Sequence, residues 1–207
     1  MIFETIVVGA LGVNCFILGC DETSEALVVD PGADADRILA LVAKRGLRVT
    51  TVVNTHGHFD HVGGNRRVLE ATGAELMIHE ADAPYLQKAV VTAARYGVAA
   101  EDSPAPSRFL TDGMTITFGR KSLQVLHTPG HTQGGCCLYL ASEGMVITGD
   151  TLFADSVGRT DLPGGSHEQL IASILGKLFT LPDETRVYPG HGPSSTIGHE
   201  RKHNPYL

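Results

Sequence analysis

Basic residues are in the minority in this sequence. Its 207 residues include 16 Lys and Arg against 23 Asp and Glu, which gives a formal net charge of -7 at pH 7. Proteins that grip phosphate backbones use clustered Lys and Arg, so the charge balance argues against a nucleic-acid-binding protein. The composition is otherwise 43% hydrophobic and 19% charged, which excludes a disordered or fibrous chain.

Long apolar segments are absent as well. The longest apolar runs, such as 26–29, are far shorter than the roughly 20 residues that a membrane-spanning helix requires. The first residues, 1–4, show neither a basic segment nor an apolar stretch leading to a cleavage site. We therefore expect a cytoplasmic protein without a signal peptide and without a membrane partner.

Cysteine is scarce, and its spacing is not that of a metal or redox motif. None of the four cysteines stands in a C-x-x-C arrangement: Cys15, Cys20, Cys136 and Cys137. Because a reducing compartment disfavours disulfides, we interpret them as small buried apolar residues. The sequence also lacks a G-x-S-x-G elbow and a phosphate-binding P-loop, so no serine nucleophile or nucleotide site is indicated.

Hydrophobic patterning predicts an α/β protein. Strands are expected as an antiparallel meander at 3–8, 14–18 and 26–29, and then at 48–54, 75–79, 114–118, 122–127, 136–140, 145–148 and 186–188. Helices are expected over 38–45, around 68–71, over 89–96, and after Ser166, whose capping box with Gln169 precedes inward apolar residues as far as Leu178. With no repeat or linker, we expect one domain, 1–207, forming a four-layer αβ/βα sandwich of two mixed β-sheets with outer helices.

The sharpest motif is a histidine-rich segment directly after a predicted buried strand. Within six positions it places His56, His58, Asp60 and His61. In an extended or turning backbone the first two histidines project to one side, and Gly57 lets the chain bend around an ion. The other two fall at the start of the next helix, where they can face a second ion. Imidazole and carboxylate together favour Zn²⁺, with iron or manganese next.

Three further candidates each follow a predicted strand and stand beside a glycine: His131, Asp150 and His191. Any one alone would be a polar loop residue, but the repeated arrangement of strand, turn and ligand supports all three as metal ligands. The remaining histidines lack this context and are expected to be structural or on the surface: His79, His127, His167, His199 and His203.

The order of these residues resembles the metallo-β-lactamase-fold hydrolases, and most closely their glyoxalase II-like branch. The resemblance extends over 30–206. It implies that His56, His58 and His131 bind one metal ion. It also implies that the second ion is bound by Asp60, His61 and His191, that Asp150 bridges the two ions, and that Asp30 supports a metal histidine. Without the resemblance, a role in forming the Pro-Gly turn is enough to explain an aspartate at position 30.

The resemblance further implies a metal-dependent thioester hydrolase. In such an enzyme a hydroxide bridging two divalent ions attacks a thioester carbonyl, here expected to be that of a hydroxyacylglutathione. Asp60 is the expected catalytic residue, because it fixes the second ion and orients the hydroxide. The charges of such a site favour a small anionic substrate, and Arg159 resembles the basic residue that this branch offers to a glutathione carboxylate. The alternative for Arg159 is an internal salt bridge with Asp161 or Asp155.

Two departures from full-length glyoxalase II leave other activities open. We expect the protein to lack the helical C-terminal domain of those enzymes, and His191 is followed by Gly192 and Pro193 rather than by an acidic and aromatic segment. The segment 158–161 also resembles persulfide dioxygenases, which hold a single iron at the positions of His56, His131 and Asp150. An RNA-cleaving enzyme, a lactone or ester hydrolase and a secreted β-lactamase are less expected. The sequence leaves the metal and the oligomeric state open.

Overall fold

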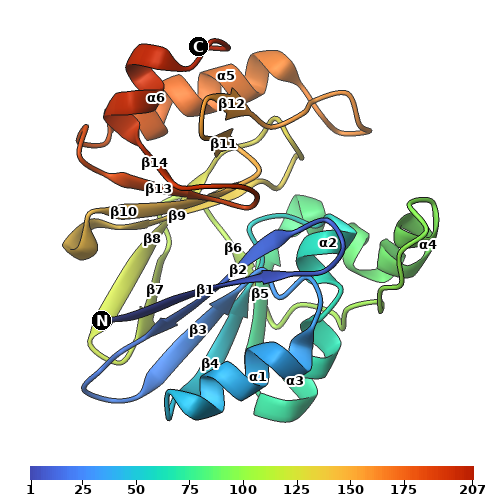
Figure 1. Cartoon of the computed structure of the whole chain (residues 1–207). Coiled ribbons are helices and arrows are strands. Elements are labelled where there is room, and N and C mark those ends of the chain that lie inside the picture. Colours follow the sequence, from blue (N-terminus) through green and yellow to red (C-terminus); the bar gives the residue numbers. More distant parts are fainter.

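Two six-stranded sheets pack face to face in the computed structural model, which describes residues 1–207, and helices cover the outer side of each sheet (Figure 1). The strand order is β1-β2-β3-β4-β5-β6 in the first sheet and β14-β13-β10-β9-β8-β7 in the second. Both sheets mix parallel and antiparallel pairs. This arrangement confirms the predicted four-layer αβ/βα sandwich.

The first sheet begins with the predicted antiparallel meander and continues with parallel strands. Its members are β1 (Ile2–Val8), β2 (Val13–Gly19), β3 (Glu25–Val29), β4 (Arg48–Val53), β5 (Glu75–His79) and β6 (Arg108–Leu110). From β3 to β6 every pairing is parallel, so the carboxyl ends of these strands lie along one edge of the sheet. Polar residues that follow the strands are thereby gathered at that edge.

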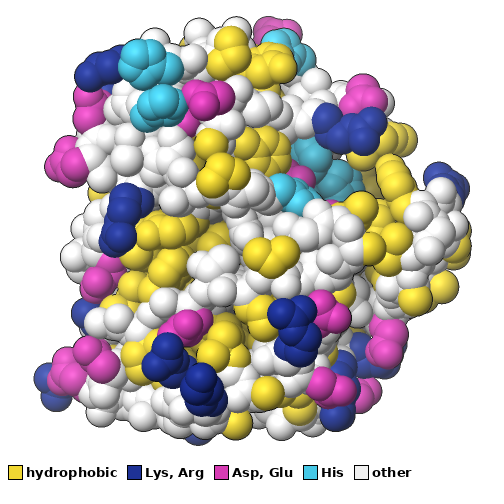
Figure 2. Space-filling view, viewed as in Figure 1, with side chains coloured by type: hydrophobic (Ala, Val, Ile, Leu, Met, Phe, Trp, Pro, Cys, Tyr) yellow, Lys and Arg dark blue, Asp and Glu magenta, His cyan; other side chains and the backbone are white.

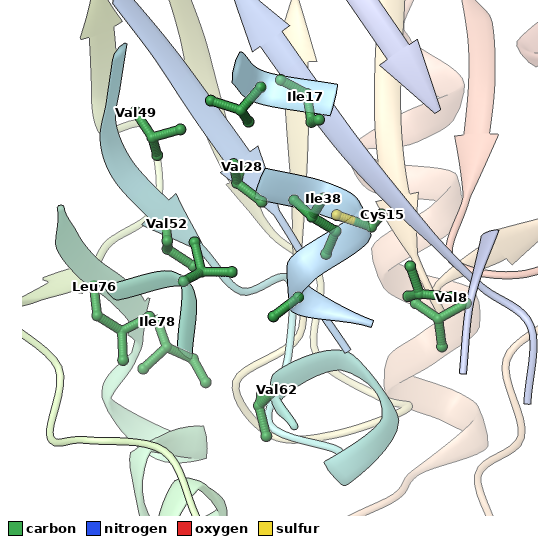
Figure 3. Close-up of a cluster of buried hydrophobic side chains, with 14 of the residues drawn as sticks. Val8, Cys15, Ile17, Val28, Ile38, Val49, Val52, Val62, Leu76 and Ile78 are labelled. Carbon is green, nitrogen blue, oxygen red and sulfur yellow. The ribbon is translucent and has the colours of Figure 1, made fainter. Parts of the chain in front are cut away.

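Helices of the first half pack their apolar faces against this sheet. They are α1 (Ala35–Lys44), α2 (Phe59–Val62), α3 (Asn65–Thr72), the 3-10 helix η1 (Glu80–Lys88) and α4 (Ala89–Ala94). In α1, buried Ile38 faces the strand residues Val28 and Val52, and Val62 of α2 lies beside them (Figure 3). The helix also carries Asp36 in its first turn and Lys44 in its last, which complements the helix dipole.

The second sheet is mostly antiparallel. Its strands are β7 (Thr115–Phe118), β8 (Lys121–His127), β9 (Cys136–Leu140), β10 (Met145–Gly149), β13 (Arg186–Pro189) and β14 (Ser195–Thr196). Only β10 and β13 pair in parallel. The outer layer and its connections comprise α5 (His167–Gly176), α6 (Ile197–His203), the hairpin β11 (Leu152–Phe153) and β12 (Ser156–Val157), and the 3-10 turns η2 (Ala141–Glu143) and η3 (Leu178–Thr180).

A shared hydrophobic core joins the two sheets. Seventeen buried residues form it, including Phe16 and Leu27 from the first sheet and Phe118 and Leu138 from the second. All four cysteines are buried and free, as predicted. The relative position of the two sheets is therefore fixed by close packing. No helix is both long enough and apolar enough to cross a membrane.

Several short elements differ from the sequence prediction. The predicted last strand, 186–188, is followed by β14 and α6, and β6 and the β11–β12 hairpin were also missed. These strands have only two or three residues, too few to show an alternating pattern. Ser166 does cap α5, but that helix ends at Gly176, so Leu178 lies in η3 instead.

The C-terminal helix α6 is held by a polar network that hydrophobic patterning does not reveal. Glu200, which is fully buried, accepts hydrogen bonds from the backbone amide of Asp155 at 3.0 Å and from Asn204 Nδ2 at 2.8 Å. Thr196 caps the helix by accepting a hydrogen bond from the His199 amide at 3.1 Å. The network ties α6 to the β11–β12 hairpin.

Because α5 packs against the second sheet, substitutions at two neighbouring residues of this helix should differ strongly in their effect on the free energy of unfolding. Ile174 is fully buried, whereas Leu175 is 51% exposed. Ile174→Ala should lower the free energy of unfolding by about 2 to 5 kcal/mol, because it removes buried methylene groups and leaves a cavity. Leu175→Ala should change it by less than about 0.5 kcal/mol. Urea unfolding of the two variants measures both values, and equal losses would contradict the placement of this helix.

Candidate metal centre

Strands from both sheets end at one edge of the sandwich, and the predicted ligands follow them. His56 comes after β4, His131 after β8, Asp150 after β10 and His191 after β13. Because these strands belong to different sheets, the ligands meet only where the sheets pack together. Figure 2 shows histidine side chains recessed in a hollow of this face, with hydrophobic and basic side chains around them.

Three imidazoles converge in the first donor group. His56 Nε2 lies 3.1 Å from His58 Nδ1, and His58 Nδ1 lies 2.9 Å from His131 Nε2. Zinc bonds of about 2.1 Å to nitrogen, arranged as a tetrahedron, place neighbouring ligand atoms about 3.4 Å apart. The three nitrogens are therefore close to the spacing at which one metal ion can bind all of them.

A second donor group lies next to the first. Asp60 Oδ2 is 3.4 Å from His191 Nε2 and 3.9 Å from His61 Nε2. Asp150 stands between the groups: its Oδ1 is 3.4 Å from His61 Nε2, and its Oδ2 is 3.6 Å from His131 Nε2. The structure thus brings all seven predicted ligands together as two groups suited to a dinuclear metal site, with Asp150 in reach of both.

The outer ring nitrogens of the histidines are anchored to the chain. His131 Nδ1 donates a hydrogen bond to the carbonyl of Arg159 at 2.8 Å, and His191 Nδ1 donates one to the carbonyl of Leu11 at 3.1 Å. A ring nitrogen that donates outward leaves the other nitrogen, Nε2, with its lone pair toward the donor group. These contacts fix both the orientation and the tautomer of the rings.

Asp30 anchors two more of the histidines from beneath the site. This fully buried carboxylate accepts a hydrogen bond from His61 Nδ1 at 3.0 Å and another from the Thr55 hydroxyl at 2.6 Å. The hydroxyl, having given its proton to Asp30, can accept from His56 Nδ1 at 3.1 Å. The family resemblance indicated Asp30 but not Thr55. The position of Thr55 directly before His56 is the feature of the sequence that could have indicated its role.

Burial sets the protonation state of the three-histidine group. Burial, together with the nearby His61 and His58 rings, lowers the pKa of His56 well below the usual histidine value. Burial and the neighbouring His131 lower the pKa of His58 to about 3. Both imidazoles are therefore neutral at pH 7, which is the form that binds metal cations.

Carboxylates dominate the other half of the site. Burial disfavours a charge on His61, yet three surrounding carboxylates outweigh this effect and raise its pKa to about 10: Asp150, Asp60 and Asp30. Burial also disfavours a charge on Asp60, but His61 and His191 lower the pKa of that carboxyl below its usual range. Asp60 is therefore ionised at pH 7, and its carboxylate attracts positive charge.

Two buried atoms in the site show that the residues fit a cation. His61 Nε2 and Asp150 Oδ1 have no hydrogen-bond partner, although buried polar atoms are almost always paired. Both residues belong, with His56, to a set whose donor atoms all lie within 4.8 Å of one another. Gly190 lies beside both residues, because a Cβ there would lie 2.3 Å from Asp150 Oδ1 and 2.7 Å from His61 Cε1. A metal ion would satisfy both unpaired atoms.

Arg159 lies at the edge of this site, on the segment that follows β12. Its backbone is fixed by His131, but its guanidinium is exposed and pairs with Asp161 through two hydrogen bonds of 2.7 Å. That hydrogen bonding raises the pKa of Arg159 and lowers the pKa of Asp161 to about 2. The structure shows the internal salt bridge that was the alternative for this residue, and it leaves the pair open to solvent.

The other histidines lie outside the two donor groups. His79 and His127 stack with ring centroids 4.1 Å apart, and His127 Nε2 donates to the Gln133 carbonyl at 3.0 Å. The three remaining histidines are exposed: His167, His199 and His203. Of these, His199 approaches carboxylates of Asp155 and Glu200, the second of which is already used by the α6 network.

Comparisons with known proteins identify the family of the chain. Residues 8–191 match the profile of the metallo-beta-lactamase superfamily. Hydroxyacylglutathione hydrolase GloC of Haemophilus influenzae is 35% identical over 209 residues, an alignment that covers 100% of this chain and 98% of that protein.

Solved structures agree in fold over the full length. The crystal structure of BLEG-1 B3 metallo-beta-lactamase superposes with a TM-score of 0.93 at 36% identity, covering 100% of this chain and 99% of that one. TTHA1623, crystallised in a di-iron-bound form, superposes with a TM-score of 0.91 at 40% identity, covering 99% and 100%. Since the profile spans most of the chain and full-length relatives share its fold, the chain belongs to the metallo-beta-lactamase superfamily, whose metallo-hydrolase chemistry the paired donor groups suit.

Proposed function

We propose that the protein is a thioester hydrolase of the glyoxalase II type that uses two divalent metal ions and acts on a hydroxyacylglutathione. The observation that carries the proposal is the pair of donor groups that share Asp150. A mononuclear enzyme would have no use for the second group, formed by Asp60, His61 and His191. The similarity to GloC, a hydroxyacylglutathione hydrolase, supports the choice of substrate.

The chain would supply the ligands and the anchoring of this centre. Divalent ions held there lower the pKa of water toward neutrality and polarise a carbonyl group. His56, His58 and His131 would hold one ion, and Asp60, His61 and His191 the other, with Asp150 in contact with both. Zinc suits this donor set best, and iron or manganese also fit it. The carboxylates Asp60 and Asp150 offset only part of the charge of two divalent ions, so the loaded site favours an anionic substrate.

Arg159 would bind a carboxylate of the substrate away from the scissile carbonyl. Its guanidinium is exposed beside the site, and its present partner, Asp161, is a solvent-exposed carboxylate of the same kind as the one expected on glutathione. A substrate carboxylate would therefore share or replace the contact with Asp161. The backbone carbonyl of Arg159 would keep its hydrogen bond to His131 throughout, because that contact does not involve the side chain.

Metal content and substrate tests decide between this proposal and its main alternative. The purified protein should hold close to two metal ions per chain and hydrolyse lactoylglutathione, and dialysis against a chelator should abolish the activity. Elemental analysis and a thioester assay check this. An active preparation with a single iron, oxidising glutathione persulfide but not hydrolysing thioesters, would instead identify a dioxygenase. A β-lactam included as substrate tests the activity that the name of BLEG-1 describes.

Asp60 should be needed for turnover rather than for folding. Asp60→Asn keeps the size and one oxygen of the side chain but removes the charge that the second donor group presents to a cation. We expect kcat to fall at least about 100-fold, with the circular dichroism spectrum unchanged. Asp36→Asn, at an exposed carboxylate on α1, is the matched control and should keep full activity. Near-normal turnover of Asp60→Asn would rule out the two-metal mechanism.

Arg159 should affect binding of the substrate and not the chemical step. A charge-assisted hydrogen bond contributes about 1.5 to 3 kcal/mol, so Arg159→Ala should raise KM for lactoylglutathione roughly 10- to 150-fold while kcat holds. A simple thioester without the peptide should show no such penalty. Asp161→Asn, which frees Arg159 from its partner, should leave KM unchanged or lower it. Equal losses of Arg159→Ala on both substrates would instead assign the residue to loop structure.

A further inference from the structure

Asp82 is a buried carboxylate in η1. It belongs to neither donor group, but it contacts the two loops that carry the three-histidine group. Its Oδ2 accepts a hydrogen bond from the Gly57 amide at 2.9 Å, and its Oδ1 accepts one from the Gly134 amide at 2.7 Å. Gly57 separates the two histidines of the loop after β4. Gly134 lies three positions after the histidine of the loop after β8. One carboxylate therefore joins two ligand loops that come from different sheets.

Both glycines are needed for this contact. A Cβ at position 134 would lie 2.6 Å from Asp82 Cγ, and a Cβ at position 57 would lie 2.8 Å from the Asp82 carbonyl oxygen. Such distances are shorter than atoms can approach without displacement. The glycines in these loops thus let the backbone amides reach the carboxylate, in addition to letting the loops turn.

We propose that Asp82 is a positioning residue that holds the three-histidine group in the geometry for a divalent metal ion. The group includes two histidines from one loop and one from the other, and the critical distance between the loops is the 2.9 Å from His58 Nδ1 to His131 Nε2. A hydrogen bond of 2.8 Å from the Cys136 amide to the Thr55 carbonyl joins the same loops at a second point. Asp82 completes the connection beside the histidines themselves.

The two side-chain oxygens of Asp82 make the connection specific. A carboxyl group offers two acceptor oxygens at a fixed separation. Here each oxygen serves a different loop, so the side chain sets their spacing. Outer groups that orient metal ligands commonly change metal affinity or activity by about 10- to 100-fold when they are substituted.

Asp82→Asn is the first test. The amide keeps one acceptor oxygen but turns an NH₂ group toward one of the two backbone donors, so one loop loses its contact. Zinc affinity should fall about 10- to 100-fold at one site, that of the three histidines. The other site, formed by Asp60, His61 and His191, should keep its affinity. Competition titration against a chromophoric chelator measures both affinities, and the absorption spectrum of the cobalt-substituted protein reports the altered histidine site.

Glu200→Gln is the matched control for loss of a buried charge. Glu200 is also fully buried and also accepts a backbone amide, that of Asp155, but it contacts neither of the two loops. This variant should lower the thermal stability of the protein while leaving both zinc affinities and the cobalt spectrum unchanged. A purely structural role for Asp82 predicts the same behaviour in both variants.

Gly134→Ala provides an independent route if Asp82→Asn fails to fold. Its methyl group would press against the Asp82 carboxylate and should produce the same loss at one site. Wild-type affinity at both sites in either variant, or an equal loss at both sites, would overturn the proposal. The inference rests on the proposed metal centre but not on its substrate, because metal binding is the readout. A protein that binds two ions but hydrolyses no thioester would contradict the proposed function alone.

Discussion

The structure depends on bringing imidazoles and carboxylates together at a largely buried site. His56 and His61 are buried, and His61 Nε2 and Asp150 Oδ1 are left without hydrogen-bond partners. Such an arrangement costs free energy in a folded chain unless a cation satisfies it. The surrounding architecture limits that cost in a specific way: Asp30, directly and through Thr55, ties two of the rings to the buried end of the first sheet.

Both sheets contribute ligands to the site, so its geometry depends on the hydrophobic core that lies between the sheets. The first sheet contributes the segment with His56, His58, Asp60 and His61, and the second contributes the other three ligands. Their relative position is set by the seventeen-residue core between the sheets. Metal ions that bind across this interface would stabilise the folded chain by an amount that rises with the logarithm of their affinity, because the unfolded chain offers no such preformed group.

How much the sequence could predict follows from the range of each interaction. The segment from His56 to His61 is local, so its spacing alone indicated a metal site, and repeated strand ends pointed to the distant ligands. Short elements such as β14 and α6 carry too little pattern, and α6 is held by a hydrogen bond from the Asp155 amide to its Glu200, a contact between residues 45 positions apart. The contacts of Asp82 with residues 25 and 52 positions away are likewise visible only once the sheets are packed. For Arg159, the sequence offered an internal salt bridge with Asp161 or Asp155 only as an alternative. The three-dimensional structure was needed to show that Asp161 is the partner.

The backbone and the side chain of Arg159 make separate contacts. Arg159 fixes the ring of His131 through its backbone carbonyl, while its side chain extends to Asp161 and solvent. A change of side chain at this position therefore leaves the hydrogen bond that orients the His131 ring in place. The Tyr85 hydroxyl donates a hydrogen bond to the Pro163 carbonyl in the same loop, and the Tyr85 ring lies near His58. The backbone carbonyls of Arg159 and Pro163 therefore hold this loop beside the donor groups independently of the contacts that the Arg159 side chain makes.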